Sequence, residues 1–135
     1  MTAEPVVLDT DVASLSLKGK LPPDVLHLLA SRIPLITFVT LAELTRWVEQ
    51  RRWGTPRRER LAHWLLGKHV LHSDDDVART WDTITAYAYL RGRPRPTNDT
   101  WVAACCLAYD LPLATRNIKD FQDFAAHEGL RILGG

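Results

Sequence analysis

The chain has 135 residues, of which 46% are hydrophobic and 24% charged. This length and composition fit one globular domain over residues 1–135 and exclude a disordered chain. The formal net charge of +1 excludes a protein-wide basic field, so any nucleic-acid contact has to come from local patches. The cysteines Cys105 and Cys106 are adjacent, a spacing typical of neither a disulfide nor a metal-ligand pair. Because no signal peptide and no apolar run of membrane-spanning length is visible, we expect a cytoplasmic protein without membrane contact.

Short apolar runs alternate with helical patterns along the chain. We predict strands over residues 6–8, 35–39, 70–72, 111–114 and 130–133. We predict helices over residues 12–17, 24–31, 41–53, 57–68, 74–90, 99–109 and 118–127. Strands that alternate with helices form parallel sheets covered on both faces, so the pattern predicts an α/β fold, a three-layer α/β/α sandwich with a mostly parallel central sheet.

Two carboxylates, Asp9 and Asp11, flank Thr10 directly after the first apolar run. That run is typical of a buried strand, and ligands bind at the carboxyl ends of strands in open α/β sheets. Acids at this place can bind a divalent cation or activate a nucleophile. The alternative is that Asp9 or Asp11 merely caps the helix that follows.

Glu43 follows Thr40, which we place at the end of the second strand. Their spacing is that of a capping box, in which a Thr hydroxyl and a Glu carboxylate bind free amides at a helix start. The same spacing puts the Glu43 carboxylate within one turn of a strand end, beside the first strand if the two strands are neighbours. Both interpretations stay open at this point.

Asp99 lies at the start of the helix after a proline-rich loop, where the helix dipole favours an acid and Thr97 or Asn98 would supply the cap. Asn117 is a natural N-cap after the fourth strand, and Asp120 falls at the third position of the next helix. Both side chains would also reach a site at the strand ends.

The repetition of such positions favours a metal site. Side chains that follow strands or open helices lie along one edge of a parallel sheet, and here they are Asp9, Glu43, Asp99, Asn117 and Asp120. Oxygen ligands suit Mg²⁺ or Mn²⁺, whereas the five histidines show no zinc spacing. The run Asp74-Asp75-Asp76 behind Ser73 is more typical of a capped, solvated helix start.

The order and spacing of four motifs resemble those of PIN domains, specifically VapC-type toxins of bacterial type II toxin–antitoxin pairs. The motifs are Val7-Leu8-Asp9-Thr10-Asp11, Thr40-Leu41-Ala42-Glu43-Leu44, Asn98-Asp99-Thr100-Trp101-Val102-Ala103-Ala104 and Leu113-Ala114-Thr115-Arg116-Asn117-Ile118-Lys119-Asp120-Phe121. The resemblance covers nearly all of the chain.

The resemblance implies a ribonuclease that binds Mg²⁺ or Mn²⁺, forms a homodimer, and joins a VapB-type antitoxin in a heterotetramer or larger complex. It implies that Asp9, Glu43 and Asp99 bind the metal, while Thr10 and Thr40 orient the first acid and its waters. Asn98 and Thr115 belong to the same motifs and are assigned as supporting residues.

Two departures from the family pattern affect the metal site. Asp11 stands where such proteins more often carry Asn, and Asn117 occupies a position that is an acid in many members. The site is then completed either by Asp120 as a further catalytic acid, or by Asn117 as a ligand that holds a water on the metal. One-metal and two-metal catalysis both stay open.

Two groups of basic residues are candidate RNA contacts. The first group combines arginines with tryptophans and would bind RNA or an antitoxin peptide. The alternative is a solvated helix pair whose tryptophans are core residues. The members of this group are Arg46, Arg51, Arg52, Arg57, Arg58, Arg60, Trp47, Trp53 and Trp64. The second, Arg91, Arg93 and Arg95, precedes Asp99 and would hold the substrate backbone, as would Arg116.

Two other functions compete with the ribonuclease. The Asp9-Thr10-Asp11 sequence also resembles the nucleophile and acid pair of a haloacid dehalogenase-type phosphatase, although no lysine follows a later strand convincingly. A PIN-like binding module without catalysis is the other alternative, which the departure at Asn117 keeps open.

Overall fold

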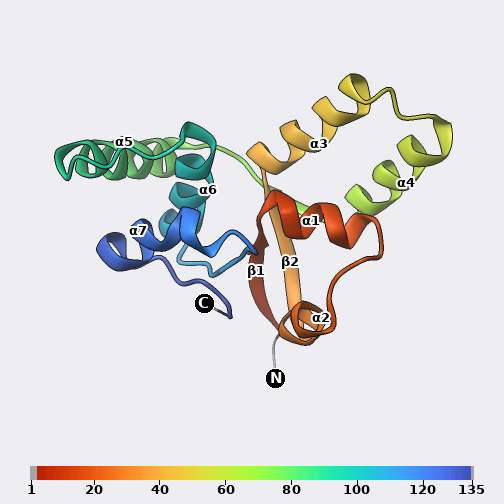
Figure 1. The fold of residues 1–135 in the computed structure, drawn as a ribbon, viewed down its shortest axis with the longest axis horizontal. Helices are drawn as coiled ribbons and strands as arrows, with labels where there is room; N and C mark the ends of the chain where they lie inside the picture. The colour runs from red at the N-terminus through yellow and green to blue at the C-terminus, as the bar shows by residue number, and fades with distance from the viewer. Residues whose placement is uncertain (1–2, 135) are drawn as a thin grey trace.

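Figure 1 shows the computed structural model, which describes residues 3–134. The strands in that part are β1 (Glu4–Leu8), β2 (Arg32–Thr37), β3 (His69–Leu71) and β4 (Leu113–Ala114). The helices are α1 (Thr10–Leu17), α2 (Pro23–Leu29), α3 (Phe38–Gln50), α4 (Thr55–Leu66), α5 (Asp75–Leu90), α6 (Thr97–Ala108) and α7 (Ile118–Glu128).

The strands form one parallel sheet in the order β3-β2-β1-β4. β1 lies between two neighbours, with Val7 opposite Leu35 of β2 on one side and opposite Leu113 of β4 on the other. Since all strands run in the same direction, the residues that follow them lie along one edge of the sheet. The predicted fold class is confirmed.

Alternating residues of β1 enter two hydrophobic cores on opposite faces of the sheet. Val7 packs with side chains of α5, α6 and α7, among them Ile84 and Phe121. Val6 and Leu8 pack with side chains of α1 and, at the rim, of α2 and α4. Figure 1 shows the same division, with α5, α6 and α7 to one side of β1 and β2 and the other helices opposite.

α3 and α4 form a helical hairpin that packs on the end of α1 through a third core. This core includes Leu44, Val48 and Trp53, and Trp53 is only 7% exposed. Trp64 donates a hydrogen bond from Nε1 to Ser16 Oγ at 3.2 Å. The alternative in which these tryptophans are core residues therefore holds for Trp53 and for much of Trp64.

The predicted boundary between the second strand and its helix is wrong by several residues. β2 ends at Thr37 and α3 begins at Phe38, within the apolar run that we predicted to be strand. The Thr37 hydroxyl accepts a hydrogen bond from the backbone N–H of Thr40 at 3.3 Å and so caps α3. A side-chain cap, rather than the end of the apolar run, determines where the helix starts.

Other predicted boundaries also differ from the structure. The expected strand at 130–133 is reduced to a bridge between Leu113 and Ile132 in the described residues. The cap of α5 is Asp74, which accepts from the backbone N–H of Val77 at 2.8 Å, rather than Ser73. Within residues 3–134, no helix has both the length and the apolar character needed to cross a membrane.

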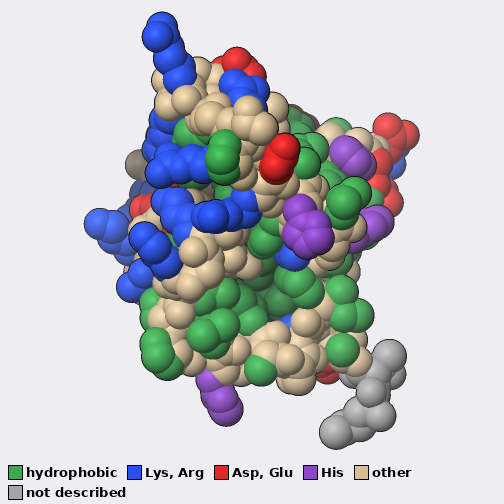
Figure 2. Space-filling model, turned by 90° about the vertical axis from the view of Figure 1, so that its right-hand side faces the viewer, with side chains coloured by type: hydrophobic (Ala, Val, Ile, Leu, Met, Phe, Trp, Pro, Cys, Tyr) green, Lys and Arg blue, Asp and Glu red, His purple; other side chains and the backbone are tan. Residues whose placement is uncertain are grey.

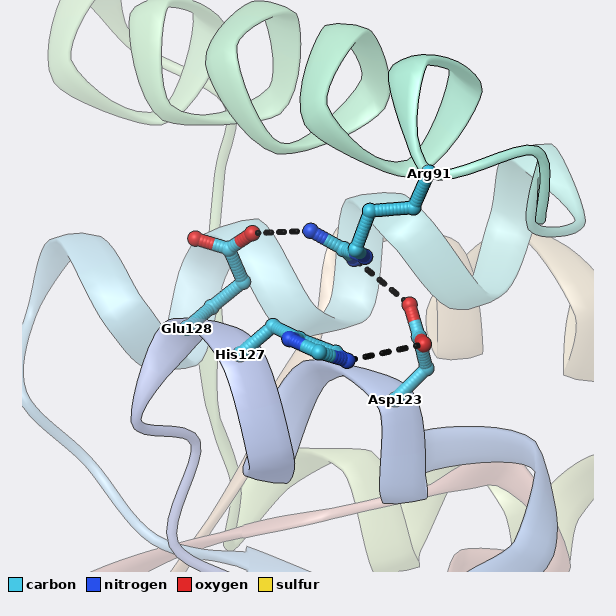
Figure 3. A network of polar contacts seen from close by, with 4 residues as sticks. All are labelled: Arg91, Asp123, His127 and Glu128. Carbon is cyan, nitrogen blue, oxygen red and sulfur yellow. Dashed lines mark hydrogen bonds and ion pairs between the residues drawn. The ribbon is translucent and has the colours of Figure 1, made fainter.

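A network of ion pairs joins the end of α5 to α7 (Figure 3). Arg91 donates from Nη2 to Asp123 Oδ2 at 2.6 Å and from Nη1 to Glu128 Oε1 at 3.1 Å, and His127 Nε2 lies 3.7 Å from Asp123 Oδ1. Burial would raise the pKa of Asp123, but the hydrogen bond and charge of Arg91 outweigh it and hold this pKa below its ordinary value. Arg91, one of the arginines predicted to hold the substrate backbone, is thus engaged by two carboxylates of α7.

Candidate active site

Asp9 is the first residue after β1, and only 8% of it is exposed. It occupies the N-cap position of α1, but its side chain makes no capping hydrogen bond. Its Oδ2 instead accepts a hydrogen bond at 2.9 Å from the hydroxyl of Thr115, which follows β4. Capping therefore does not account for this carboxylate, whose place is set by two adjacent strands.

Asp11 lies in the first turn of α1 and joins that helix to the segment after β4. Its Oδ1 accepts from the backbone N–H of Val12 at 2.7 Å, and its Oδ2 accepts from the backbone N–H of Arg116 at 2.9 Å. The segment that contains Asn117 is thereby held against the start of α1.

Glu43 lies in the second turn of α3 and is partly buried. The predicted capping box is wrong, because Thr37 and not Thr40 caps this helix. Thr40 is fully buried, and its hydroxyl is hydrogen-bonded to the hydroxyl of Thr10 at 2.9 Å. The two hydroxyls join the beginnings of α1 and α3 beside the carboxylate of Glu43.

Asp99 lies in the first turn of α6 and is partly buried. The N-cap of this helix is Pro96, which has no side-chain oxygen, so the predicted caps Thr97 and Asn98 are wrong: both lie inside the helix. The helix dipole still favours a carboxylate at this position.

One cavity of about 240 Å³, which we call the acidic cavity, brings the predicted acids together. It is lined by Asp9, Thr10, Asp11, Glu43, Trp47, Asp99, Val102 and Asn117. All four side chains predicted as metal ligands are therefore at one place, although they come from separate parts of the chain.

The other predicted site residues lie beside this cavity. Thr40 and Thr115 are hydrogen-bonded to residues of its wall. Asn98 lines a neighbouring cavity of about 270 Å³ that shares Glu43 with the acidic cavity. Asp120 lies in the first turn of α7, near enough to Asp99 for its charge to raise the pKa of that carboxyl.

The pKa of Asp9 is raised from 3.8 to about 7. Burial is the main cause, the charge of Asp11 is the second, and Asp99 adds a smaller effect in the same direction. Hydrogen bonds from the Thr115 hydroxyl and the Thr10 backbone oppose the rise. Without a cation, a negative charge on Asp9 is therefore strongly disfavoured.

The pKa values of Asp99 and Glu43 are raised as well. For Asp99 the causes are burial and then the charges of Asp120 and Glu43, against the opposing charge of Arg95. For Glu43 the cause is burial, which Arg46 opposes. The acids thus repel one another in a partly desolvated site, as expected where a cation belongs.

This donor set fits a hydrated cation that prefers oxygen ligands. Within residues 3–134, no three His, Cys, Asp or Glu side chains converge as a closed ligand cage would require. Mg²⁺ keeps several waters and binds through one or two carboxylates, so acids spread around a cavity of about 240 Å³ suit it. Mn²⁺ shares this preference for oxygen.

The other three arginines predicted to hold the substrate backbone differ in their placement. Arg116 lines a hollow of about 490 Å³ that adjoins the acidic cavity and shares several lining residues with it. Arg95 is close enough to Asp99 to lower its pKa, against the effect of burial. Arg93 is exposed in the same loop, and its charge acts on Asp123.

Two residues of the cavity wall were not predicted as site residues. Trp47 was expected only in the surface of arginines and tryptophans, and Val102 was named only as part of the motif that contains Asp99. Each follows an acid by three or four residues on the same helix, Trp47 after Glu43 and Val102 after Asp99, and such neighbours share a helix face. This spacing was the signal that would have found them.

Comparisons with known proteins agree with this architecture. The sequence profile of the PIN domain family matches residues 6–126. A chain of VapBC-5 from Mycobacterium tuberculosis, a member of the VapBC family of toxin–antitoxin systems, is 33% identical, with a TM-score of 0.70 over 95% of this chain and 96% of that chain. A chain of FitAcB from Neisseria gonorrhoeae is 28% identical, with a TM-score of 0.79 over 94% of this chain and 95% of that chain.

A chain of VapBC2 from Rickettsia felis, bound to a DNA fragment from its promoter, is 20% identical and shows the likeness of fold alone. Its TM-score is 0.80 over 95% of this chain and 96% of that chain. No curated protein matches the sequence significantly.

Because the profile spans most of the sequence, the chain belongs to the PIN domain family. Within that family it is of the VapC type, as its 33% identity to a chain of VapBC-5 over almost the full length of both chains indicates. The resemblance seen in the four sequence motifs is thereby confirmed, and the alternative of a haloacid dehalogenase-type phosphatase is left without support.

Proposed function

We propose that this protein is a metal-dependent endoribonuclease that acts as the toxin of a toxin–antitoxin pair. One observation carries the proposal: Asp9, Glu43 and Asp99 come from separate elements and line one cavity at the edge where the parallel strands end. The relation to VapBC-5, itself part of a toxin–antitoxin system, supports the role of toxin.

In this proposal the oxygen atoms of the acidic cavity hold Mg²⁺ or Mn²⁺. Asp9, Glu43 and Asp99 contribute carboxylates, and Asn117 contributes its amide oxygen, directly or through a water. When bound, such a cation makes hydroxide available near neutral pH and neutralises the charge that develops on a phosphate under attack.

The remaining residues position these acids. Thr115 fixes one oxygen of Asp9 by its hydrogen bond at 2.9 Å, and the paired hydroxyls of Thr10 and Thr40 fix the start of α1 against α3. Asp120 acts beside Asp99 as a further acid of the site, since its charge reaches that carboxyl.

Other side chains complete the wall and the substrate contacts. Asp11 keeps the Asn117 segment in place through its hydrogen bond with the Arg116 backbone. Asn98 extends the site into the neighbouring cavity. Arg95, Arg116 and, at the outside of the loop, Arg93 bind the phosphate backbone of the RNA.

We also propose a VapB-type antitoxin as the partner, bound to a homodimer of this chain in a heterotetramer or larger complex. Several of the similar structures are VapBC complexes, two of them bound to DNA, which supports this kind of assembly.

The test is cleavage of total bacterial RNA by the antitoxin-free protein, with Mg²⁺ or Mn²⁺ and, in parallel, with EDTA. We expect discrete cuts only with metal, and a loss of at least about 100-fold in rate for Asp99→Asn, the size typical when one electrostatic group of an active site is removed. Asp82→Asn, which changes an exposed carboxylate of α5, is the matched control and should cleave normally.

Mn²⁺ binding, measured by calorimetry on the same preparations, separates the possible failures. If neither cleavage nor Mn²⁺ binding is found, the nuclease proposal is contradicted and a PIN-like binding module takes its place. If Mn²⁺ binds but total RNA is not cleaved, individual structured RNAs are the next substrates to assay.

A further inference from the structure

We propose that a second site, a basic pocket at the far end of helices α1 and α3, binds the phosphate backbone of the RNA substrate away from the acidic cavity. The inference rests on the proposed ribonuclease function and adds a binding site to it. Several independent features of the described residues support it.

The basic pocket has a volume of about 260 Å³ and lies between the end of α1 and the α3–α4 hairpin. It is lined by Leu17, Lys18, Lys20, Arg51, Trp53, Arg57 and Arg60. All but two of these side chains are cationic, and none is an acid. Figure 2 shows Lys and Arg side chains gathered on the face of the molecule to which α3 and α4 belong.

In the part of the chain that the structure describes, the cations of the basic pocket have no acidic partners. Within residues 3–134, none of them forms an ion pair. Arg58, on the same helix, behaves differently: it binds Glu49 Oε1 at 3.2 Å and the carbonyl of Trp53 at 2.8 Å, and it does not line the pocket. In a chain with a net charge of +1, this is a local concentration of unpaired positive charge, which favours an anionic ligand.

Trp53 adds an independent observation. Its side chain lines the basic pocket and is almost fully buried, yet its indole N–H has no hydrogen-bond partner in the described part of the chain. Buried donors are rarely left unpaired in folded proteins. A ligand rich in oxygen would satisfy the surrounding cations.

The acidic cavity, a hollow beside it and the basic pocket follow one another along α1. The acidic cavity is lined by Asp11 at the start of the helix, and the adjoining hollow of about 490 Å³ by Ser14 and Leu15. The basic pocket is lined by Leu17 and Lys18 at its end. Successive turns of α1 thus lead from one site to the other.

The same progression occurs on α3, which packs against α1. Glu43 lines the acidic cavity, Trp47 lines both that cavity and the adjoining hollow, and Arg51 lines the basic pocket. The guanidinium of Arg51 lies 4.4 Å from the centre of the Trp47 ring, so the pair forms a continuous link. Eight residues of α-helix span about 12 Å, which sets the separation of the two sites along α3.

A single-stranded RNA is the ligand that fits both ends of this path. Its phosphates repeat along the strand, so that one of them can lie at the acidic cavity while another lies at the basic pocket. An acidic peptide would suit the basic pocket as well, but it has no phosphate to place beside a cation in the acidic cavity, which is what the proposed ribonuclease requires.

The test measures binding without cleavage. A labelled single-stranded RNA of about 12 nucleotides, within the site sizes of known single-strand-binding grooves, is titrated with the full chain in EDTA at several salt concentrations. The test variant is Arg60→Glu, and the control is Arg79→Glu, which makes the same charge change at an exposed position of α5. Arg60→Gln serves as a milder second variant, and circular dichroism verifies that each variant is folded.

We expect Arg60→Glu to weaken binding on the order of fivefold at about 0.1 M salt and to reduce the slope of log K against log salt concentration by about 0.7, the loss of one phosphate contact on a single strand. Arg79→Glu should change neither value. Equal binding by the two variants would overturn the basic pocket as an RNA site. Tighter binding of a polyglutamate peptide than of RNA, lost in Arg60→Glu, would overturn it in favour of an acidic peptide.

Cleavage assays on the same proteins keep this inference separate from the proposed function. If the wild type cleaves RNA in the presence of metal and Arg60→Glu binds RNA as well as the wild type does, the basic pocket is not an RNA site, but the nuclease proposal is supported. If RNA binds through the basic pocket but is not cleaved with any metal, the nuclease proposal is contradicted. The protein is then a nucleic-acid-binding PIN domain.

Discussion

Replacement of Asp9 by Asn should stabilise the metal-free protein at neutral pH. Burial and the charge of Asp11 raise the pKa of Asp9 from 3.8 to about 7, so the folded state opposes ionisation of this carboxyl. The interval between these values, at about 1.4 kcal/mol for each pKa unit, gives an upper bound of about 4 kcal/mol. Asn has nearly the same shape and can still accept the hydrogen bond from Thr115.

The pH dependence has a definite sign. A carboxyl whose folded-state pKa is raised contributes its full stability below about pH 4, and that stability is lost as the pH rises towards 7. In EDTA we therefore expect the wild type to lose stability between about pH 4 and pH 7, whereas Asp9→Asn loses much less. At pH 8 the variant should be more stable by about 1–4 kcal/mol, a large part of the total for a domain of this size.

Urea unfolding followed by fluorescence of the five tryptophans measures this difference. In Mn²⁺ the advantage of the variant should shrink by about 2.7 kcal/mol, because a ligand at 100 times its Kd adds this amount to the wild type and little to a variant that lacks a ligand. Asp82→Asn, at an exposed site, should follow the wild type in both conditions. If Asp9→Asn is equally destabilising at pH 4 and pH 8 in EDTA, the carboxylate is a structural acceptor and the reasoning is refuted.

Three further changes test other parts of the structure. Asp123→Ala should lower the free energy of unfolding by about 1.5 kcal/mol in urea titrations, because Arg91 loses its hydrogen bond to this carboxylate but keeps the one to Glu128; a loss below about 0.5 kcal/mol would mean that the network does not anchor α7. Thr40→Val should cost about 1 kcal/mol by removing the hydrogen bond to the hydroxyl on α1, and an unchanged value would show that water replaces this bond. Burial raises the pKa values of Cys105 and Cys106, so a thiol reagent at pH 8 should label them only as fast as the protein opens; rapid labelling in the native state would contradict their burial.

Part of the site was predictable because its signals are local. An apolar run followed by Asp9, and an acid in the first turn of a helix at Asp99, are patterns within a few residues. Such patterns reflect the hydrophobicity and helix propensity of the chain itself, and they gave the alternation of strands and helices from which the parallel sheet followed.

The competing explanations could not be separated in the same way. Capping was a sound alternative for Asp9 and for Glu43, and the outcome depended on which group each side chain contacts. Asp9 is bound by Thr115, more than one hundred residues later, and Thr37 rather than Thr40 caps α3. Neither hydrogen bond can be inferred from the hydrophobic periodicity of the sequence.

The partners of the arginines could not be predicted from the sequence either. Arg91, Arg58 and Arg60 look alike in sequence, each in a basic stretch near aromatic or proline residues. In the structure Arg91 is bound to two carboxylates and Arg58 to Glu49, whereas Arg60 lines the basic pocket. Whether a cation is available to a ligand depends on its partners across the fold.

The sequence by itself determined the class of fold and the candidate acids, because hydrophobic alternation and oxygen-bearing side chains at strand ends are properties of short segments. Only the tertiary structure decided which side chains form the site. The strand order β3-β2-β1-β4 brings Asp9 beside Thr115, and the packing of α6 brings Asp99 opposite Glu43. These placements depend on contacts between distant parts of the chain, where the free energy of burial and pairing, rather than local propensity, selects the partner.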